Sequence, residues 1–155
     1  MSRWLVKTEP KTYAWSDLVR EGRTAWSGVS NPQAQANLRA MRKGDGVVVY
    51  HSGVKEAVGL AEVVREGYPE PGTDGLVCVD LRPRESLPSP VGLDALRSSK
   101  AFAGSPLLRQ GRLSVVPLED AQWEEVLRLA SRPAPATRPS RPARRPARAR
   151  RAVRS

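Results

Sequence analysis

The sequence contains few residues that form disulfides or metal sites, and it has no long apolar run. Its single cysteine, Cys78, excludes a disulfide framework and a cysteine-based metal site. Its single histidine, His51, has no second metal ligand at a useful spacing. No segment approaches the roughly 18 apolar residues of a membrane helix, and the first residues lack the features of a signal peptide. These absences predict a protein of a reducing compartment, the cytoplasm, with no metal, no cofactor and no membrane contact.

Charge is distributed unevenly along the chain. All 16 acidic residues lie before residue 126, whereas nine of the 26 Lys and Arg residues lie in residues 131–155. Residues 1–130 are therefore close to neutral, and the net charge of +10 describes the C-terminal tail. The tail consists mainly of Arg, Pro and Ala, so it cannot bury enough apolar surface to offset its ordering entropy. We expect one folded domain over 1–130 and a disordered basic tail over 131–155.

Motifs for phosphate-dependent or nucleophilic catalysis are also absent. Gly44-Asp45-Gly46 is a turn signal with no dinucleotide or Walker pattern beside it. His51 and Ser52 are adjacent, and adjacent residues on a strand point to opposite faces, so they do not form a base and nucleophile pair. The sequence favours a binding protein with no catalytic residues, and an enzyme acting on nucleotides is the weaker alternative.

Residues 26–52 predict a loop, a helix, a tight turn and a buried strand. Asn31 followed by Pro32 is typical of a helix start, because Asn caps free N–H groups and Pro is tolerated in the first turn. An apolar stripe follows at Ala34, Leu38 and Met41. Gly44 is expected to end the helix, and residues 47–50 are apolar throughout, which predicts a strand buried on both faces.

The remaining pattern predicts an α+β fold, a small mixed β-barrel with flanking short helices. Expected strands cover residues 3–7, 56–65, 76–82 and 113–116, and expected helices cover 16–20, 92–98 and 119–130. Gly59 indicates a bulge or a close backbone approach within its strand. Prolines at 83, 88 and 90 predict an irregular connection, and residues 101–111 are expected to form a loop.

Several motifs occur in an order that resembles a known family. They are WLVKTEP from residue 4, WSGVSNPQA from residue 26, RAMRKGD from residue 39, VVYHS from residue 48 and GLAEVVREGYP from residue 59. Together they resemble the EVE domain of the PUA-like superfamily over residues 1–130. The resemblance implies a PUA-like barrel that binds nucleic acid and reads a modified base, with modified cytosine in DNA as the first expectation.

A pocket that reads an extruded base requires flat walls, groups for the base edge and cations for the flanking phosphates. Trp26 and Tyr50 supply walls, and the edge contacts are expected from Asn31, Ser52 and the backbone of Gly28 and Val29. With the neighbouring His51, these seven residues form the predicted base pocket. The pocket rim or phosphate side is assigned to Lys7, Thr8, Glu9, Arg109 and Arg112, of which Thr8 and Glu9 are implied by the resemblance.

Structural roles compete with each of these assignments. Trp26 and Tyr50 could be core residues, Asn31 is explained by helix capping alone, and a lone His at a strand exit is usually structural. The same pocket could also bind RNA or a small ligand.

We expect the protein to be a monomer.

The tail supports a second hypothesis. Flexible arginines bind nucleic-acid phosphates through counterion release without reading sequence. The residues expected to do so are Arg138, Arg141, Arg144, Arg145, Arg148, Arg150 and Arg151. A solubilising tail is the alternative. Frequent Arg, Ala and Pro indicate a GC-rich bacterial genome, in which such a protein could associate with the nucleoid.

Overall fold

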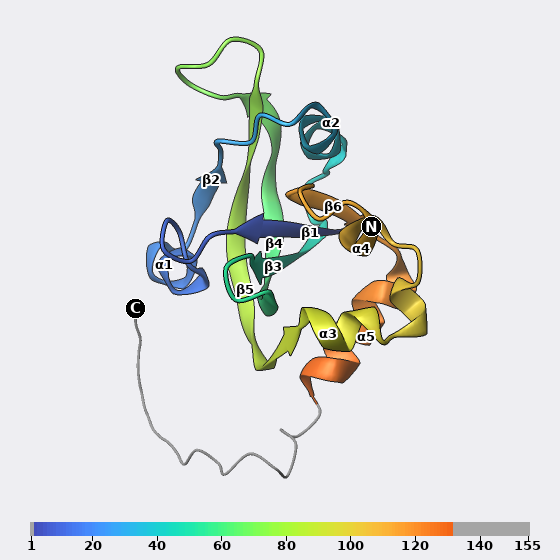
Figure 1. The fold of residues 1–155 in the computed structure, drawn as a ribbon. Coiled ribbons are helices and arrows are strands. Elements are labelled where there is room, and N and C mark those ends of the chain that lie inside the picture. Colours follow the sequence, from blue (N-terminus) through green and yellow to red (C-terminus); the bar gives the residue numbers. More distant parts are fainter. Residues whose placement is uncertain (1, 132–155) are drawn as a thin grey trace.

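A six-stranded sheet organises residues 2–131, the part of the chain that our computed structural model describes (Figure 1). The strands lie in the order β2-β5-β4-β3-β1-β6. They are β1 (Arg3–Thr8), β2 (Thr24–Trp26), β3 (Gly46–His51), β4 (Glu56–Pro69), β5 (Val77–Gly92) and β6 (Val115–Leu118). Only the β1–β3 pair is parallel among these strands. The α+β class is confirmed, with the difference that the sheet stays open between β2 and β6 instead of closing into a barrel.

Short helices flank the sheet. They are α1 (Trp15–Glu21), α2 (Pro32–Ala40), α3 (Leu93–Arg97), η1 (Lys100–Phe102), α4 (Pro106–Arg109) and α5 (Asp120–Ala130). The sequence of α5 predicts an apolar stripe of Trp123, Val126, Leu127 and Ala130, and all of these are buried except Leu127, which is half-buried. The predicted loop over 101–111 is wrong in part, because η1 and α4 each form one tight turn there. Such single turns are too short to show a helical period in the sequence.

The prediction over residues 26–52 is largely confirmed. The Asn31 side chain accepts a hydrogen bond from the Ala34 N–H at 3.0 Å, which caps α2. Strand β3 lies between β1 and β4, and residues 46–50 are all buried. Helix α2 ends at Ala40, earlier than expected, because Met41 adopts an extended backbone. Trp26, expected in a loop, is the last residue of β2.

Strand β5 continues through the three prolines, where the sequence predicted an irregular connection. Its second half pairs with β4 alone, since β2 reaches only Val79 to Leu81. Proline is tolerated on such an edge because its missing N–H would face away from the neighbouring strand. The pairing also shifts register several times, which accommodates the prolines.

Gly59 is confirmed as a site of close approach. The ring of Trp15 lies so near that a Cβ atom at Gly59 would be 2.3 Å from it. The β3–β4 and β4–β5 registers both shift next to this residue.

The described residues were compared with the requirements of membrane helices and metal sites. Within residues 2–131, no helix has the length and apolarity needed to span a bilayer. The same residues contain no group of three or more His, Cys, Asp or Glu placed to hold a metal ion. The predicted tail arginines lie outside the described residues.

Candidate functional site

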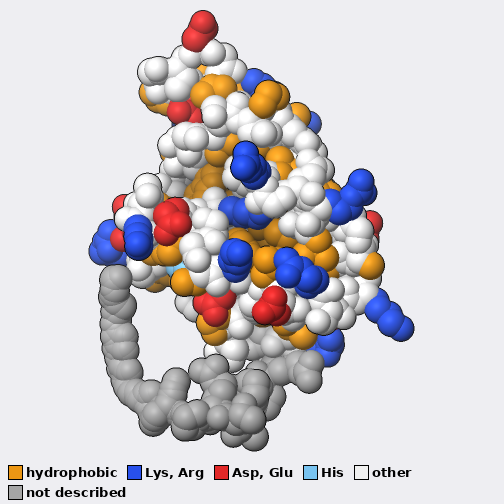
Figure 2. Space-filling view, viewed as in Figure 1, with side chains coloured by type: hydrophobic (Ala, Val, Ile, Leu, Met, Phe, Trp, Pro, Cys, Tyr) orange, Lys and Arg blue, Asp and Glu red, His pale blue; other side chains and the backbone are white. Residues whose placement is uncertain are grey.

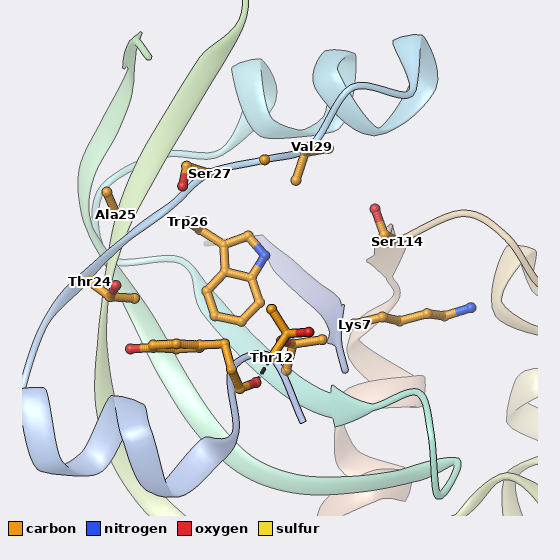
Figure 3. Close-up of a pocket in the computed structure, with 11 residues that line it drawn as sticks. Lys7, Thr12, Thr24, Ala25, Trp26, Ser27, Val29 and Ser114 are labelled. Atoms are coloured by element: carbon orange, nitrogen blue, oxygen red, sulfur yellow. Dashed lines mark hydrogen bonds between the residues drawn. The ribbon is translucent and has the colours of Figure 1, made fainter. Parts of the chain in front are cut away.

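A cleft of about 440 Å³ opens where β1, β2 and the loop after β2 meet (Figure 3). We call it the Trp26 cleft. Its lining consists of Lys7, Thr8, Thr12, Tyr13, Thr24, Ala25, Trp26, Ser27, Gly28, Val29 and Ser114. The volume lies within the range of about 300–1,000 Å³ that small-ligand sites occupy. Lys7 is the one charged residue in this lining, so the cleft combines apolar walls, hydroxyl groups and a single cation.

A buried carboxylate holds β2, and with it Trp26, against the sheet. Asp80 on β5 is 7% exposed and accepts hydrogen bonds from Arg23 at 2.8 and 3.2 Å and from the Tyr68 hydroxyl. Burial alone would raise the pKa of Asp80, but the bonds from Tyr68 and Arg23 outweigh it and hold that pKa below its usual value. The three-residue strand β2 is thus fixed by a charged contact as well as by its ladder to β5.

The indole of Trp26 forms a wall of the cleft. Only 7% of the residue is exposed, and its ring meets Tyr13 edge to face with 6.0 Å between the ring centroids. No acceptor for the Trp26 indole N–H is found in residues 2–131, whereas the indoles of Trp4 and Trp15 donate to Asp45 and Ser86. Figure 3 shows the Trp26 nitrogen on the side of the ring that faces Val29 and Ser114. The cleft therefore presents a directed donor on an aromatic wall.

Tyr13 is fixed beneath that wall. Its hydroxyl donates to Glu21 at 2.7 Å, and burial raises its pKa to about 12. Its backbone carbonyl accepts from the Thr8 hydroxyl at 2.7 Å. The phenol consequently stays neutral at physiological pH, and Tyr13 and Trp26 form a rigid aromatic pair.

The loop after β2 has its own anchors. Gly28 adopts φ 78°, and its N–H donates to Glu70 at 3.2 Å. The Val29 carbonyl accepts from the buried Gln35 side chain at 2.6 Å. The predicted backbone groups are therefore near the cleft, but both already have partners within the protein.

Lys7 lies between the Trp26 cleft and a second one. Its Nζ donates to the Gly111 carbonyl at 2.9 Å and lies 5.8 Å from the centroid of the Tyr50 ring. Burial lowers its pKa. The second cleft, of about 260 Å³, is called the Tyr50 cleft and is lined by Lys7, Tyr50, Ser52, Lys55, Leu93, Arg97, Leu107, Leu108 and Gly111.

The predicted base pocket is thus divided between two clefts. Trp26, Gly28 and Val29 line the first, and Tyr50 and Ser52 line the second. In the sheet, β1 lies between β3 and β6, and Lys7 on β1 pairs with Tyr50 on β3.

Other predicted site residues line neither cleft. Asn31 caps α2. The His51 Nε2 accepts a hydrogen bond from the backbone N–H of Trp15 at 2.9 Å, and burial lowers the pKa of His51. Glu9, Arg109 and Arg112 are exposed and also lie outside both linings. Thr8 does line the Trp26 cleft.

Sequence reasoning missed several lining residues, of which Tyr13 is the most important. It lies in the turn between β1 and α1, and nothing in the local pattern connects it to Trp26. The missed hydroxyl residues are Thr12, Thr24, Ser27 and Ser114. An aromatic residue inside a turn was the available signal, since a turn rarely needs one for its own stability.

Comparison with known proteins places this geometry in context. A family model described as the EVE domain matches residues 2–129. The Rhodopseudomonas palustris protein Rpa0253 is 38% identical with a TM-score of 0.80, covering 84% of this chain and 93% of its own. A human THYN1 structure in complex with DNA containing 5-methylcytosine is 29% identical with a TM-score of 0.75, covering 86% of this chain and 100% of its own. Human thymocyte nuclear protein 1 is 38% identical over 82 residues, which span 44% of this chain and 36% of the human protein.

Proposed function

This chain belongs to the EVE domain family, and on that premise we propose that it binds nucleic acid and reads a modified base, with modified cytosine in DNA as the preferred target. The base enters the Trp26 cleft after leaving the stack. The observation that carries the proposal is the Trp26 indole, whose donor faces an open cleft of nucleobase-compatible size. The human THYN1 structure with methylated DNA supports the choice of ligand.

The cleft offers what a cytosine ring requires. A flipped base is held by stacking or apolar walls and by hydrogen bonds to its edge. Trp26 provides both a wall and an N–H donor, and Ser27 and Ser114 add hydroxyls that donate or accept. A methyl group on the base needs an apolar contact, which Val29 and Ala25 can supply.

The lining favours binding over turnover. It contains no His, Cys, Asp or Glu, which leaves the Lys7 amine and hydroxyl groups as the candidate bases and nucleophiles of the described cleft. Lys7 is committed to the Gly111 carbonyl and is suited to attracting a phosphate near the entrance. We therefore assign a reader function and no catalytic residue.

The C-terminal arginines add affinity without selectivity. Residues 131–155 contain nine Arg and no acidic residue. If about six of them contact phosphates, affinity should fall by roughly three orders of magnitude between 50 and 200 mM salt. In this arrangement the domain selects the base and the tail raises the local concentration of nucleic acid.

The test is a titration of the 155-residue chain with DNA duplexes that carry cytosine, 5-methylcytosine or 5-hydroxymethylcytosine at one site. We expect a preference for one modified duplex of about tenfold, which corresponds to about 1.4 kcal/mol. Trp26→Ala should remove the preference. Trp123→Ala is the matched control, because Trp123 is 8% exposed and lies outside the Trp26 cleft.

Equal binding of all three duplexes by the wild-type chain would overturn the cytosine assignment. Parallel titrations with modified RNA and free nucleosides then identify the alternative ligands of the same cleft. Mass spectrometry of each nucleoside after incubation tests the enzyme alternative, and any converted product would contradict a pure reader.

A further inference from the structure

The Tyr50 cleft carries positive charge without a lining carboxylate. Lys7, Lys55 and Arg97 line it together with leucines, Ser52 and the Tyr50 ring. Arg97 faces Asp94 at 3.8 Å, but Asp94 is fully exposed, so this contact is weak and leaves the guanidinium able to bind another anion. In Figure 2, several Lys and Arg side chains lie around an apolar surface in the middle of the face shown, with acidic side chains along its lower margin.

Two hydroxyl donors in this cleft have no acceptor within the described residues. The Tyr50 ring is largely buried, and the hydroxyls of Tyr50 and Ser52, which line the cleft, make no hydrogen bond within residues 2–131. Neither hydroxyl is sealed from solvent, so both can donate to a ligand that enters the cleft. Burial raises the pKa of Tyr50, which keeps the phenol in its donor form at neutral pH.

These features define the chemistry of the ligand. Three cations and two hydroxyl donors match a tetrahedral oxyanion, which accepts several hydrogen bonds at once. The guanidinium of Arg97 can form two parallel bonds, and the ammonium groups of Lys7 and Lys55 act as point charges. A volume of about 260 Å³ holds a phosphate group but leaves little room for a nucleoside as well.

We propose that the Tyr50 cleft binds a phosphate group, and that in nucleic acid this is a phosphate beside the nucleotide whose base occupies the Trp26 cleft. The second part rests on the proposed function. Lys7 lines both clefts, so the two sites adjoin at a single side chain. A nucleotide has the same arrangement, with a flat base and a tetrahedral anion joined through one sugar.

The decisive variant is the double substitution Lys55→Gln with Arg97→Gln. Both side chains are exposed, so the fold should persist. We expect affinity for DNA to fall about five- to tenfold at moderate salt, equally for modified and unmodified duplexes. The slope of log affinity against log salt should decrease by about 1 to 2, because each lost phosphate contact removes about one released counterion.

The matched control is Lys43→Gln with Arg20→Gln. It makes the same charge change with an exposed Lys in a turn and an Arg in the last turn of a helix, and Arg20 also faces an acid three residues away. Neither residue lines the Trp26 or Tyr50 cleft. If the control lowers the salt slope as much as the test variant does, the proposal is overturned, since general charge would then explain the effect.

A second measurement separates a backbone phosphate from a free one. Amide chemical shifts of residues 50–55 and 97 are followed during titration with inorganic phosphate, deoxycytidine and deoxycytidine monophosphate. Chemical-shift changes with phosphate and the monophosphate, but not with deoxycytidine, support a phosphate site. If the monophosphate saturates the site with an affinity like that of DNA, the ligand of this site is a free nucleotide and the backbone-phosphate part of the proposal is wrong. Shifts caused by deoxycytidine alone would overturn the phosphate assignment.

The two proposals can fail independently. A reduced salt slope in a protein without base preference would leave the phosphate site standing and remove the reader. A retained base preference with an unchanged slope would remove only the phosphate site. Tyr50→Phe keeps the buried ring and removes the hydroxyl, and it should weaken binding of the monophosphate about threefold, as expected for one hydrogen bond of about 0.7 kcal/mol.

Discussion

Two largely buried tryptophans line two clefts on this small sheet, and their surroundings differ. Trp26 and Trp123 are 7% and 8% exposed. The cleft beside Trp123, of about 340 Å³, is lined by Arg3, Gly44, Gly46, Leu60, Ala61, Glu62, Arg84, Glu85 and Trp123. We call it the Trp123 cleft. Exposure and volume alone would rank the two clefts as similar.

The difference lies in the protein groups that already contact each indole ring. The Arg3 guanidinium lies 4.5 Å over the centroid of Trp123, and Gly46 packs against the edge of that ring. The cleft also contains Glu85 and a Glu62 carboxylate that is paired with Arg82 and Arg84, so charges of both signs already occupy it. The Trp26 ring contacts only the edge of Tyr13 among aromatic and cationic groups of the described chain. Accessible aromatic surface becomes a candidate binding wall when the protein supplies neither its cation nor a competing charge.

The largest expected effect is on stability at the Trp123 cleft. A Cβ atom at Gly46 would lie 2.7 Å from the Trp123 ring and 3.0 Å from the Arg3 guanidinium. We expect Gly46→Ala to lower the free energy of unfolding by about 2 kcal/mol through overpacking, with the base preference retained. Urea denaturation measures the loss, and Gly92→Ala, where a Cβ atom meets nothing within 4 Å, is the control. An equal loss at Gly92 would contradict the packing argument.

A smaller effect is expected in the loop of the Trp26 cleft. Gly28 and Gly72 have φ angles of 78° and 79°, and a Cβ atom at either would meet nothing within 4 Å. Alanine in this left-handed conformation costs about 1 to 2 kcal/mol, so both substitutions should reduce stability equally. Only Gly28→Ala should also weaken binding of modified DNA, because Gly28 lines the cleft and Gly72 does not. Parallel loss of binding in Gly72→Ala would show that the effect arises from stability alone.

The Trp26 and Tyr50 clefts show which features of this molecule the sequence predicts and which it does not. The Asn31 cap and the buried strand β3 were predicted because short-range chemistry determines them: a capping side chain three residues from its N–H, and an unbroken apolar run. The three-residue strand β2 was missed because it depends on pairing with β5 and on the distant contact of Arg23 with Asp80. The sequence also could not predict that Trp26 and Tyr50 line separate clefts. This separation depends on the strand order of the folded sheet, in which β1 lies beside β3.

The proline-rich half of β5 is a strand that local sequence rules fail to predict. Pro83, Pro88 and Pro90 disfavour a central strand, and the sequence does not reveal that this half pairs with β4 only. Tyr13 was missed because its partner, Trp26, comes from a different element. Local rules therefore located the elements, and nonlocal contacts built the site.

A subtler comparison uses the same substitution in both clefts. Trp26→Phe keeps an aromatic wall and removes the indole N–H that has no partner in the described structure. We expect affinity for the modified duplex to fall about fivefold, equivalent to about 1 kcal/mol for one hydrogen bond, while affinity for the unmodified duplex changes less. Trp123→Phe should leave both affinities unchanged. Fluorescence anisotropy with both duplexes measures this, and an unchanged preference in Trp26→Phe would remove the indole donor from base recognition.

The smallest expected effect concerns pH and again separates the clefts. Glu62 accepts hydrogen bonds from Arg82 at 3.0 Å and Arg84 at 2.9 Å, and these hold the pKa of Glu62 below its usual value. A lowered folded pKa means that the contact stabilises the fold above the unfolded pKa of about 4.3 and that this gain disappears as the pH falls through the folded value. We expect Glu62→Gln to cost about 0.5 kcal/mol at pH 7 and nothing near pH 2.

Lys7 in the Trp26 cleft is the reference for that pH experiment. Burial lowers its pKa from the high value of an ordinary lysine, so Lys7 is charged in both folded and unfolded states under acidic conditions. The stability difference between wild type and Lys7→Gln should therefore stay constant between about pH 5 and pH 2, the range over which the Glu62→Gln difference closes. Urea denaturation across this range compares the two. A Glu62→Gln difference that does not close would mean that its cost comes from lost packing instead of lost charge, and the carboxylate would then no longer distinguish the Trp123 cleft from the Trp26 cleft.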